Sequence, residues 1–162
     1  MENSYKICKY NKDNYEVFKN MVFDYFTKDL KIDLTDKQLE YVCKEIELHS
    51  EKNIGFLDLI FENENPIGFI SYQIDSKESD WCEKEGFGCI REFYIIPSHR
   101  KKGFGEKLVK HAENNLAKLS ISDIYLTADD EGSIIFYNKM GYSENGEICL
   151  KNNCKIYIKK IV

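Results

Sequence analysis

The segment from residue 100 to residue 105 has the composition of a phosphate-binding turn. Its residues are Arg100, Lys101, Lys102, Gly103, Phe104 and Gly105. If this turn opens a helix, the first amides of that helix lack intrahelical partners and its macrodipole is positive, so an anion is stabilised there. The two glycines let the anion approach the backbone because they have no Cβ. The pattern predicts a site for a bound pyrophosphate.

The flanking sequence predicts a strand and a helix that place this turn. β-Favouring residues stand upstream, and a proline then ends the strand. These residues are Ile90, Phe93, Tyr94, Ile95 and Ile96, followed by Pro97. Downstream, apolar residues recur at helical spacing. They are Phe104, Leu108, Ala112 and Leu116.

Two familiar phosphate-binding motifs do not match the segment. A Walker loop ends in Gly-Lys-Ser/Thr, whereas Gly105 is followed by Glu106 and Lys107, so no hydroxyl is present for magnesium. A dinucleotide fingerprint needs a third glycine where this chain has Leu108, and it usually opens a domain. The P-loop is excluded, and a nicotinamide or flavin site is not expected.

Two motifs together resemble one family. Residues 100–105 read Arg-x-x-Gly-x-Gly, and residues 136–142 read Phe-Tyr-Asn-Lys-Met-Gly-Tyr. This pair resembles the GNAT superfamily of acyl-CoA-dependent N-acetyltransferases, most strongly over residues 86–142. The resemblance implies an α/β (α+β) fold with a mixed, mostly antiparallel sheet of about six to seven strands, a splayed parallel pair and about four flanking helices.

The resemblance also implies acetyl-CoA as co-substrate. In the family the first motif wraps the pyrophosphate of coenzyme A, a role that falls here to residues 100–105. Backbone groups of Phe93, Tyr94 and Ile95 would bond the pantetheine arm. A backbone amide near Tyr94 would stabilise the oxyanion of the reaction.

By the same resemblance, Tyr137 is the expected donor to the departing thiolate. A phenol and a thiol have ordinary pKa values of about 10 and 8.5, so we expect a strong hydrogen bond that becomes proton transfer as charge develops. The alternative role for Tyr137 is core packing, which we expect of Phe136. Asp130 and Ser133 depart from the Asn and Ala that often precede this helix in the family, so local packing is expected to differ there.

Glu92 is the leading candidate for the general base that accepts the amine proton, directly or through water. It lies in the predicted strand beside the acyl site, where a carboxylate is unusual unless it is paired. The alternative is a buried ion pair with Arg91 or another cation. Neither His99, in the turn, nor His111, on the next helix, is expected to be catalytic, although imidazole titrates near neutrality.

Residue types do not identify the amine acceptor. The resemblance places its pocket at about residues 25–35 and 146–153. Five acidic residues before the coenzyme strand could gather a polyamine, an aminoglycoside or a lysine side chain, or could form a solvated mobile loop. They are Asp75, Glu78, Asp80, Glu83 and Glu85.

The composition fits a single domain covering residues 1–162. With 43% apolar residues the chain can bury a core. A net charge of −5 disfavours nucleic acid and anionic membranes as partners and favours a cationic acceptor such as an amine. No signal-peptide core or transmembrane-length apolar run is present, so a cytoplasmic protein is expected.

The six cysteines lack a Cys-x-x-Cys pair, and in a reducing compartment they are expected to be free thiols. Their spacing does not suggest a metal site. Neither Cys82 nor Cys89 has a neighbouring histidine in sequence to activate it, so a covalent acyl-enzyme is not expected.

The order of the other predicted elements fits the same fold. The predicted strands are residues 5–10, 54–61, 66–74, 86–96, 124–127, 142–149 and 154–161. Four helices are predicted. The first carries an apolar face from Tyr15 to Tyr25, and the second follows a capping box at 35–38. The third and fourth cover residues 104–116 and 132–139. A strand-helix-strand crossover then predicts one parallel pair in an otherwise antiparallel sheet.

The resemblance therefore implies an N-acetyltransferase that moves the acetyl group of acetyl-CoA directly to a primary amine of a small molecule or peptide, through a ternary complex and without metal. The alternative is a non-catalytic acyl-CoA-binding sensor or interaction module. Transfer of a longer acyl group would depend on pocket depth. A homodimer that pairs through its C-terminal strands, as many relatives do, is compatible with the sequence.

Overall fold

The computed structural model describes residues 4–52 and 54–162. Its strands form a seven-stranded sheet in the order β1-β2-β3-β4-β5-β7-β6. The strands are β1 (Tyr5–Lys9), β2 (Gly55–Glu62), β3 (Asn65–Ile74), β4 (Gly88–Ile95), β5 (Asp123–Ala128), β6 (Ser143–Ile148) and β7 (Lys155–Lys160). The helices are α1 (Tyr15–Asp24), α2 (Asp36–Ser50), α3 (Phe104–Lys118) and α4 (Glu131–Lys139), and the short turns are η1 (Lys12–Asn14), η2 (Tyr25–Asp29) and η3 (Pro97–His99). The mixed sheet, with β4 and β5 parallel, confirms the predicted fold.

The chain divides into two compact units, and β3, β4 and α3 each pass from one unit to the other. Unit 1 comprises Met1–Ser71 and Glu92–Val109, and unit 2 comprises Tyr72–Arg91 and Lys110–Val162. Unit 1 therefore contains the glycine-bearing turn at 100–105, and unit 2 contains the motif at 136–142. The single domain over residues 1–162 stays a prediction.

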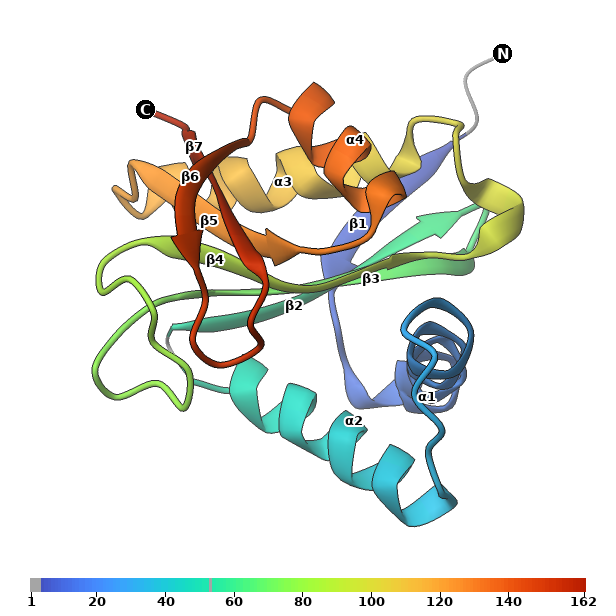
Figure 1. Cartoon of the computed structure of the whole chain (residues 1–162). Helices are drawn as coiled ribbons and strands as arrows, with labels where there is room; N and C mark the ends of the chain where they lie inside the picture. The colour runs from blue at the N-terminus through green and yellow to red at the C-terminus, as the bar shows by residue number, and fades with distance from the viewer. Residues whose placement is uncertain (1–3, 53) are drawn as a thin grey trace. The chain divides into compact units, whose positions relative to one another are not determined.

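In unit 1, α1 and α2 pack against one face of the strands (Figure 1). β1 pairs antiparallel with β2, from Tyr5 opposite Glu62 to Lys9 opposite Asp58. The apolar stripes of both helices face the sheet, as their periodicity predicts. The resulting core includes Phe18, Val22, Leu39, Cys43, Leu57, Leu59, Phe69 and Tyr94.

The start of α2 was predicted from the sequence, whereas the continuation of α1 into η2 was not. α2 begins at the predicted capping box, in which the Gln38 amide donates to Thr35 Oγ1 at 3.2 Å and the Thr35 amide donates to Gln38 Oε1 at 2.8 Å. These bonds satisfy two amides that would otherwise be unpaired. α1 instead continues without a break into η2, a π-helical turn that the sequence did not predict.

A two-residue turn joins β2 to β3. Asn63 and Glu64 both have positive φ, 47° and 71°, as a tight hairpin of the primed type requires. The predicted connection at 62–65 was therefore too long at both ends, because Glu62 belongs to β2 and Asn65 to β3.

In unit 2, β5 lies between the first residues of β4 and strand β7. It is parallel to β4 in the register Gly88–Ile124 and Cys89–Tyr125, and it is antiparallel to β7 along its whole length. β6 and β7 pair antiparallel and form a hairpin beside β5 (Figure 1). The buried cluster of this unit comprises Cys89, Tyr125, Cys149 and Ile156.

Candidate functional site

The phosphate turn, defined here as residues 97–105, joins β4 to α3. After η3 the backbone bends through Lys101 (φ 60°) and Gly103 (φ 88°). The Gly103 carbonyl accepts a hydrogen bond from the Lys107 amide at 3.2 Å, so the helical bonding of α3 begins at Gly103. The amides of the next three residues belong to the set that a helix N-terminus leaves without intrahelical partners. The predicted position of the turn at a helix N-terminus is confirmed.

The outer side of this turn is open. Lys101, Lys102 and Gly103 are exposed, whereas Phe104 is buried and anchors the first turn of α3. A Cβ built on Gly103 would meet no atom beyond its chain neighbours within 4 Å. An anion can therefore reach the backbone here, with lysine side chains on the same loop.

The Arg100 side chain makes contacts inside unit 1. Its Nε donates to the Ile95 carbonyl at 2.7 Å, and its Nη2 donates to Asp29 Oδ2 at 2.6 Å. The guanidinium carbon lies 5.4 Å from the centroid of the Tyr94 ring. Sequence reasoning placed Arg100 in the turn but missed Asp29, which no local motif marks.

His99 fixes the other side of the turn. Its Nε2 lies 2.6 Å from Glu62 Oε2, and its Nδ1 lies 2.9 Å from Ser98 Oγ. The His99 ring also packs on Phe104, with the ring centroids 5.9 Å apart. These contacts hold His99 against Glu62, Ser98 and Phe104, and the expectation that it is not catalytic stays a prediction.

The strand residues of the predicted coenzyme site lie in unit 1 with the turn. Tyr94 and Ile95 are buried, and Glu92 and Phe93 are half-buried. β3 approaches β4 closely at Gly68, where an added Cβ would lie 2.4 Å from the Tyr94 carbonyl oxygen. Gly68 is therefore part of what fixes the backbone of β4 at the predicted site.

The environment of Tyr94 keeps its hydroxyl protonated. Burial first, and then the nearby Asp24 carboxylate, raises the pKa of Tyr94 to about 12, although the Arg100 guanidinium opposes the shift. The Tyr94 ring also packs against Tyr25 and Phe69, with ring centroids 5.9 Å away in both cases. Tyr94 thus contributes a neutral aromatic side chain beneath Arg100.

Tyr137 lies in unit 2, on α4. It is buried, and its ring packs edge-on against Phe136 at 5.1 Å and Tyr142 at 5.6 Å between centroids. Asp130 caps this helix by accepting a hydrogen bond from the Ser133 amide at 2.9 Å. The two departures from the family pattern therefore form a well-made N-cap, which positions the helix that carries Tyr137.

Tyr142 is a second buried tyrosine beside Tyr137. Its hydroxyl has no hydrogen-bond partner among residues 4–52 and 54–162, and burial, followed by the Glu113 carboxylate, raises its pKa. Lys159 lies over the ring at 5.6 Å and bonds Glu113 at 2.7 and 3.0 Å.

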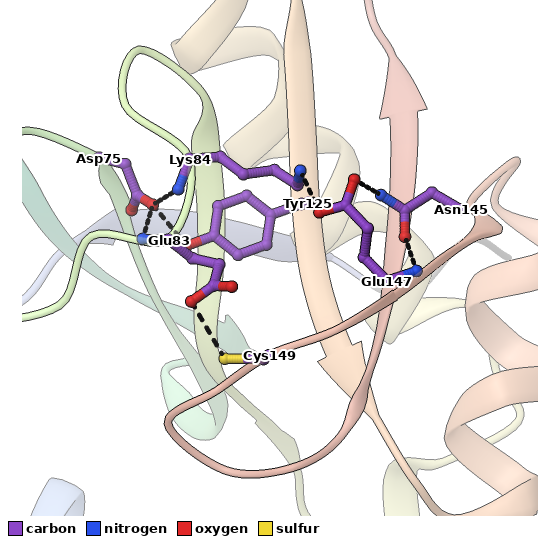
Figure 2. Close-up of polar contacts among 7 residues, drawn as sticks. All are labelled: Asp75, Glu83, Lys84, Tyr125, Asn145, Glu147 and Cys149. Carbon is purple, nitrogen blue, oxygen red and sulfur yellow. Dashed lines mark hydrogen bonds and ion pairs between the residues drawn. The ribbon is translucent and has the colours of Figure 1, made fainter.

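The predicted acidic loop is organised around a buried carboxylate (Figure 2). Asp75 is 1% exposed, and its Oδ2 accepts from the amides of Glu83 and Lys84, each at 2.9 Å, and from the Tyr125 hydroxyl at 2.5 Å. Gln73 Nε2 donates to Asp75 Oδ1 at 2.6 Å. Asp75 is therefore a structural group, and its inclusion among solvent-facing charges that gather a cation was wrong.

Further contacts tie this loop to the β6–β7 hairpin within unit 2. Lys84 Nζ bonds Glu147 at 2.8 Å, and Cys149 Sγ lies 3.7 Å from Glu83 Oε2, as Figure 2 shows. Lys151 Nζ donates to the Asp80 carbonyl at 2.8 Å. The exposed carboxylates that the loop still presents belong to Glu78, Asp80 and Glu85.

The six cysteines are free thiols in the part of the chain that the structure describes. Burial raises the pKa of the Cys89 thiol, and nearby Asp75 adds to this shift. The pKa of the Cys82 thiol is also raised, by partial removal of the thiol from water and then by Asp75, although the residue as a whole is exposed. Among the described residues, His, Cys, Asp and Glu side chains form no group of three that could hold a metal. In the same part of the chain, no helix has the length and apolar character needed to span a membrane.

Comparisons with known proteins agree on one family. The sequence profile of the acetyltransferase (GNAT) family matches residues 16–142. The spermine/spermidine N(1)-acetyltransferase of Bacillus subtilis is 30% identical over 142 residues, which cover 82% of this chain and 90% of that protein.

Solved structures show the same fold. The PaiA N-acetyltransferase of Thermoplasma acidophilum, in complex with coenzyme A, has a TM-score of 0.75 at 18% identity, covering 97% of this chain and 99% of the other. An aminoglycoside 6'-N-acetyltransferase, complexed with coenzyme A, has a TM-score of 0.70 at 17% identity, covering 97% of each chain. At these identities the likeness concerns the fold.

Proposed function

Because the chain belongs to the GNAT family of acetyltransferases, we propose that it transfers the acetyl group of acetyl-CoA directly to a primary amine of a small molecule or peptide. The observation that carries this proposal is the phosphate turn itself. It follows β4 and opens α3, so it presents the amides of a helix N-terminus beside the exposed residues Lys101, Lys102 and Gly103.

The coenzyme would lie along the end of β4 and the phosphate turn. The Arg100 amide already donates to the Pro97 carbonyl at 3.3 Å, so the amides of residues 101–105 would receive the pyrophosphate, with Lys101 and Lys102 adding positive charge. Backbone groups of Phe93, Tyr94 and Ile95 would bond the pantetheine arm. All of these groups belong to unit 1, and Gly68 and Arg100 support the backbone that presents them.

The reaction needs a donor for the departing thiolate, and Tyr137 is our choice. Its ring lies in a buried aromatic group on a capped helix, which fixes its orientation. A phenol that is neutral at pH 7 can donate a hydrogen bond and then a proton as negative charge develops on sulfur. Tyr142 is a neighbouring tyrosine at a different position of the same motif, so it is the natural comparison.

Glu92 is the proposed general base. It is half-buried in the strand that would hold the pantetheine arm, so it lies within unit 1 close to the predicted coenzyme backbone contacts. A carboxylate that is partly removed from water can take up a proton from an ammonium acceptor directly or through one water molecule. Arg91, the alternative partner, donates to Gln73 Oε1 at 3.2 Å and lies 5.7 Å from the Trp81 ring.

Direct transfer in a ternary complex is supported by the state of the thiols. A cysteine nucleophile must form a thiolate, which requires a lowered pKa and access to substrate. Cys89 is buried with a raised pKa, and the pKa of Cys82 is raised as well. The acyl group would therefore pass to the amine without an acyl-enzyme intermediate.

A polyamine is the first acceptor to test. The Bacillus subtilis relative carries the name spermine/spermidine N(1)-acetyltransferase, and this chain presents exposed carboxylates at Glu78, Asp80 and Glu85. Negative side chains attract a cationic substrate and speed its encounter with the protein. Aminoglycosides and lysine peptides complete the panel.

The decisive experiment measures free-thiol release from acetyl-CoA in the presence of each amine. We expect release that depends on one amine class and falls roughly a hundredfold in Tyr137→Phe, because a general acid contributes on this scale. Coenzyme A affinity should be nearly unchanged in this variant. Tyr142→Phe, which removes the neighbouring phenol, is the matched control and should keep turnover.

The other outcomes discriminate between the alternatives. Coenzyme A binding without release for any amine would favour the sensor or interaction module. Loss of turnover in Tyr142→Phe with retention in Tyr137→Phe would move the donor role to Tyr142. Absence of coenzyme A binding would overturn the proposed function.

A further inference from the structure

The π-helical turn η2 places an acidic side chain where a regular helix would not. η2 (Tyr25–Asp29) continues α1, and the Leu30 amide donates to the Tyr25 carbonyl at 3.0 Å, five residues back. Turns of this kind are rare and occur frequently at functional sites. The extra residue in the turn changes the direction in which the following side chains, including Asp29, leave the helix.

Asp29 uses this position to bind the phosphate turn. Its Oδ2 accepts a hydrogen bond from Arg100 Nη2 at 2.6 Å, across 71 residues of sequence. Both side chains are partly exposed, at 31% for Asp29 and 40% for Arg100. The pair therefore holds its geometry with help from other contacts, because isolated exposed ion pairs contribute little.

Those other contacts surround the Arg100 guanidinium. The Ile95 carbonyl accepts from Nε at 2.7 Å, and the Tyr94 ring lies below the guanidinium at 5.4 Å. Tyr94 in turn packs against Tyr25, the first residue of η2, with ring centroids 5.9 Å apart. The end of β4, the phosphate turn and η2 thus share one charged and aromatic cluster within unit 1.

We propose that Asp29 is a positioning residue for coenzyme binding: it holds Arg100 across Tyr94, and through Arg100 it fixes the turn that receives the pyrophosphate. This inference rests on the proposed function. Asp29 itself does not touch the coenzyme. Because coupling between two sites is reciprocal, coenzyme binding at the turn also stabilises η2 and the residues that follow it.

Coenzyme A affinity is the first test. Asp29→Asn keeps the size of the side chain but removes its charge, and we expect coenzyme A to bind about tenfold more weakly by titration calorimetry, within the usual range of coupling between sites. Asp24→Asn is the matched control, because Asp24 is a carboxylate of the same segment that pairs with Lys28 at 3.1 Å. The coenzyme A affinity of the Asp24→Asn variant should stay within about twofold of that of the unaltered protein.

A double-mutant cycle separates positioning from a general loss of structure. Arg100→Gln should weaken coenzyme A binding, and adding Asp29→Asn should weaken it no further, since the two residues act through one contact. In turnover assays Asp29→Asn should raise the KM for acetyl-CoA and leave kcat unchanged. Additive effects, or equal affinity in Asp29→Asn and the unaltered protein, would overturn the inference.

Hydrogen exchange gives a readout that needs no turnover. Coenzyme A should slow exchange of the Leu30 and Ile32 amides, which bond the Tyr25 and Phe26 carbonyls at 3.0 and 2.8 Å, and Asp29→Asn should abolish this protection. Equal protection in the variant would contradict the proposal. If Asp29→Asn fails to fold, Arg100→Lys, which keeps the charge but lacks the planar fork, makes the same test. Failure of the unaltered protein to bind coenzyme A would instead defeat the proposed function.

Discussion

At the residue scale, we propose different roles for two neighbouring tyrosines. Tyr137 and Tyr142 are both buried on the same aromatic cluster, yet only Tyr137 occupies the tyrosine position of the family motif. The Tyr142 hydroxyl lacks a hydrogen-bond partner among the described residues, so removing it should cost little stability. This makes Tyr142→Phe a fair control for the loss of one phenol.

The six thiols provide a residue-scale prediction about the absence of a covalent intermediate. At pH 8, iodoacetamide should label Cys8 first and Cys82 more slowly, because both are exposed but the pKa of Cys82 is raised. Cys43 and Cys89 should stay unlabelled in the folded protein, since burial raises the pKa of each, to about 12 for Cys43. Mass spectrometry of proteolytic peptides measures the order.

Labelling in denaturant is the control for this order, and there all six thiols should react at similar rates. Rapid modification of Cys89 in the folded protein would contradict the prediction. It would also restore Cys89 as a candidate acyl-enzyme nucleophile, because fast modification reports an accessible thiolate.

At the scale of elements, the close approach of β3 to β4 supports the proposed coenzyme strand. Gly68→Ala should destabilise the protein by about 1–3 kcal/mol, because the new Cβ would lie 2.4 Å from the Tyr94 carbonyl oxygen and the backbone must shift. Coenzyme A affinity should fall with it, since Tyr94 is a proposed pantetheine contact. Urea unfolding and calorimetry measure the two effects.

Gly132→Ala offers a matched control for this change. Gly132 lies in α4, where an added Cβ would come no closer than 3.5 Å to a side-chain oxygen, and alanine favours a helix. Its stability should be unchanged or higher. Unaltered stability in Gly68→Ala would mean that β3 and β4 adapt without strain.

The acidic loop before β4 contains a carboxylate whose role depends on the fold. Asp75 belongs to a sequence rich in carboxylates, but four donors converge on it in the interior. A buried carboxylate needs such partners, since an unpaired one would be strongly destabilising. The Asp75 carboxylate, which the sequence analysis grouped with charges that could gather a cationic ligand, therefore holds the loop in place.

At the scale of the whole molecule, buried acids predict a loss of stability in alkali. The pKa of Tyr94 and that of Cys43 each rise to about 12, from ordinary values of 10 and 9. A group whose pKa is higher when folded adds stability below its unfolded pKa, and that stability is lost as pH rises through the folded pKa. The free energy of unfolding should thus decline between about pH 9 and pH 12.

Urea unfolding at a series of alkaline pH values checks this decline. Tyr94→Phe cannot ionise at this position, so its curve should be shallower between about pH 10 and pH 12 than that of the unaltered protein. Parallel curves would show that Tyr94 ionises in the folded state as readily as in the unfolded state.

The sequence by itself determined the features that depend on neighbouring residues. Strand and helix periodicity, the capping box at Thr35 and the break at Pro97 are local, and they predicted the order of elements and the helix N-terminus at the phosphate turn. The motifs at 100–105 and 136–142 then identified the family, because their spacing is also written along the chain.

Only the tertiary structure decided the contacts that join distant segments. Asp29 meets Arg100, Asp75 meets Tyr125, and Gly68 admits the Tyr94 carbonyl, yet no periodicity or motif links these positions. The π-helical form of η2 belongs here too, because propensity does not distinguish it from a continued α-helix. Such contacts depend on how packed elements bring their side chains together, and the free energy of that packing is spread over the core rather than carried by any local pattern.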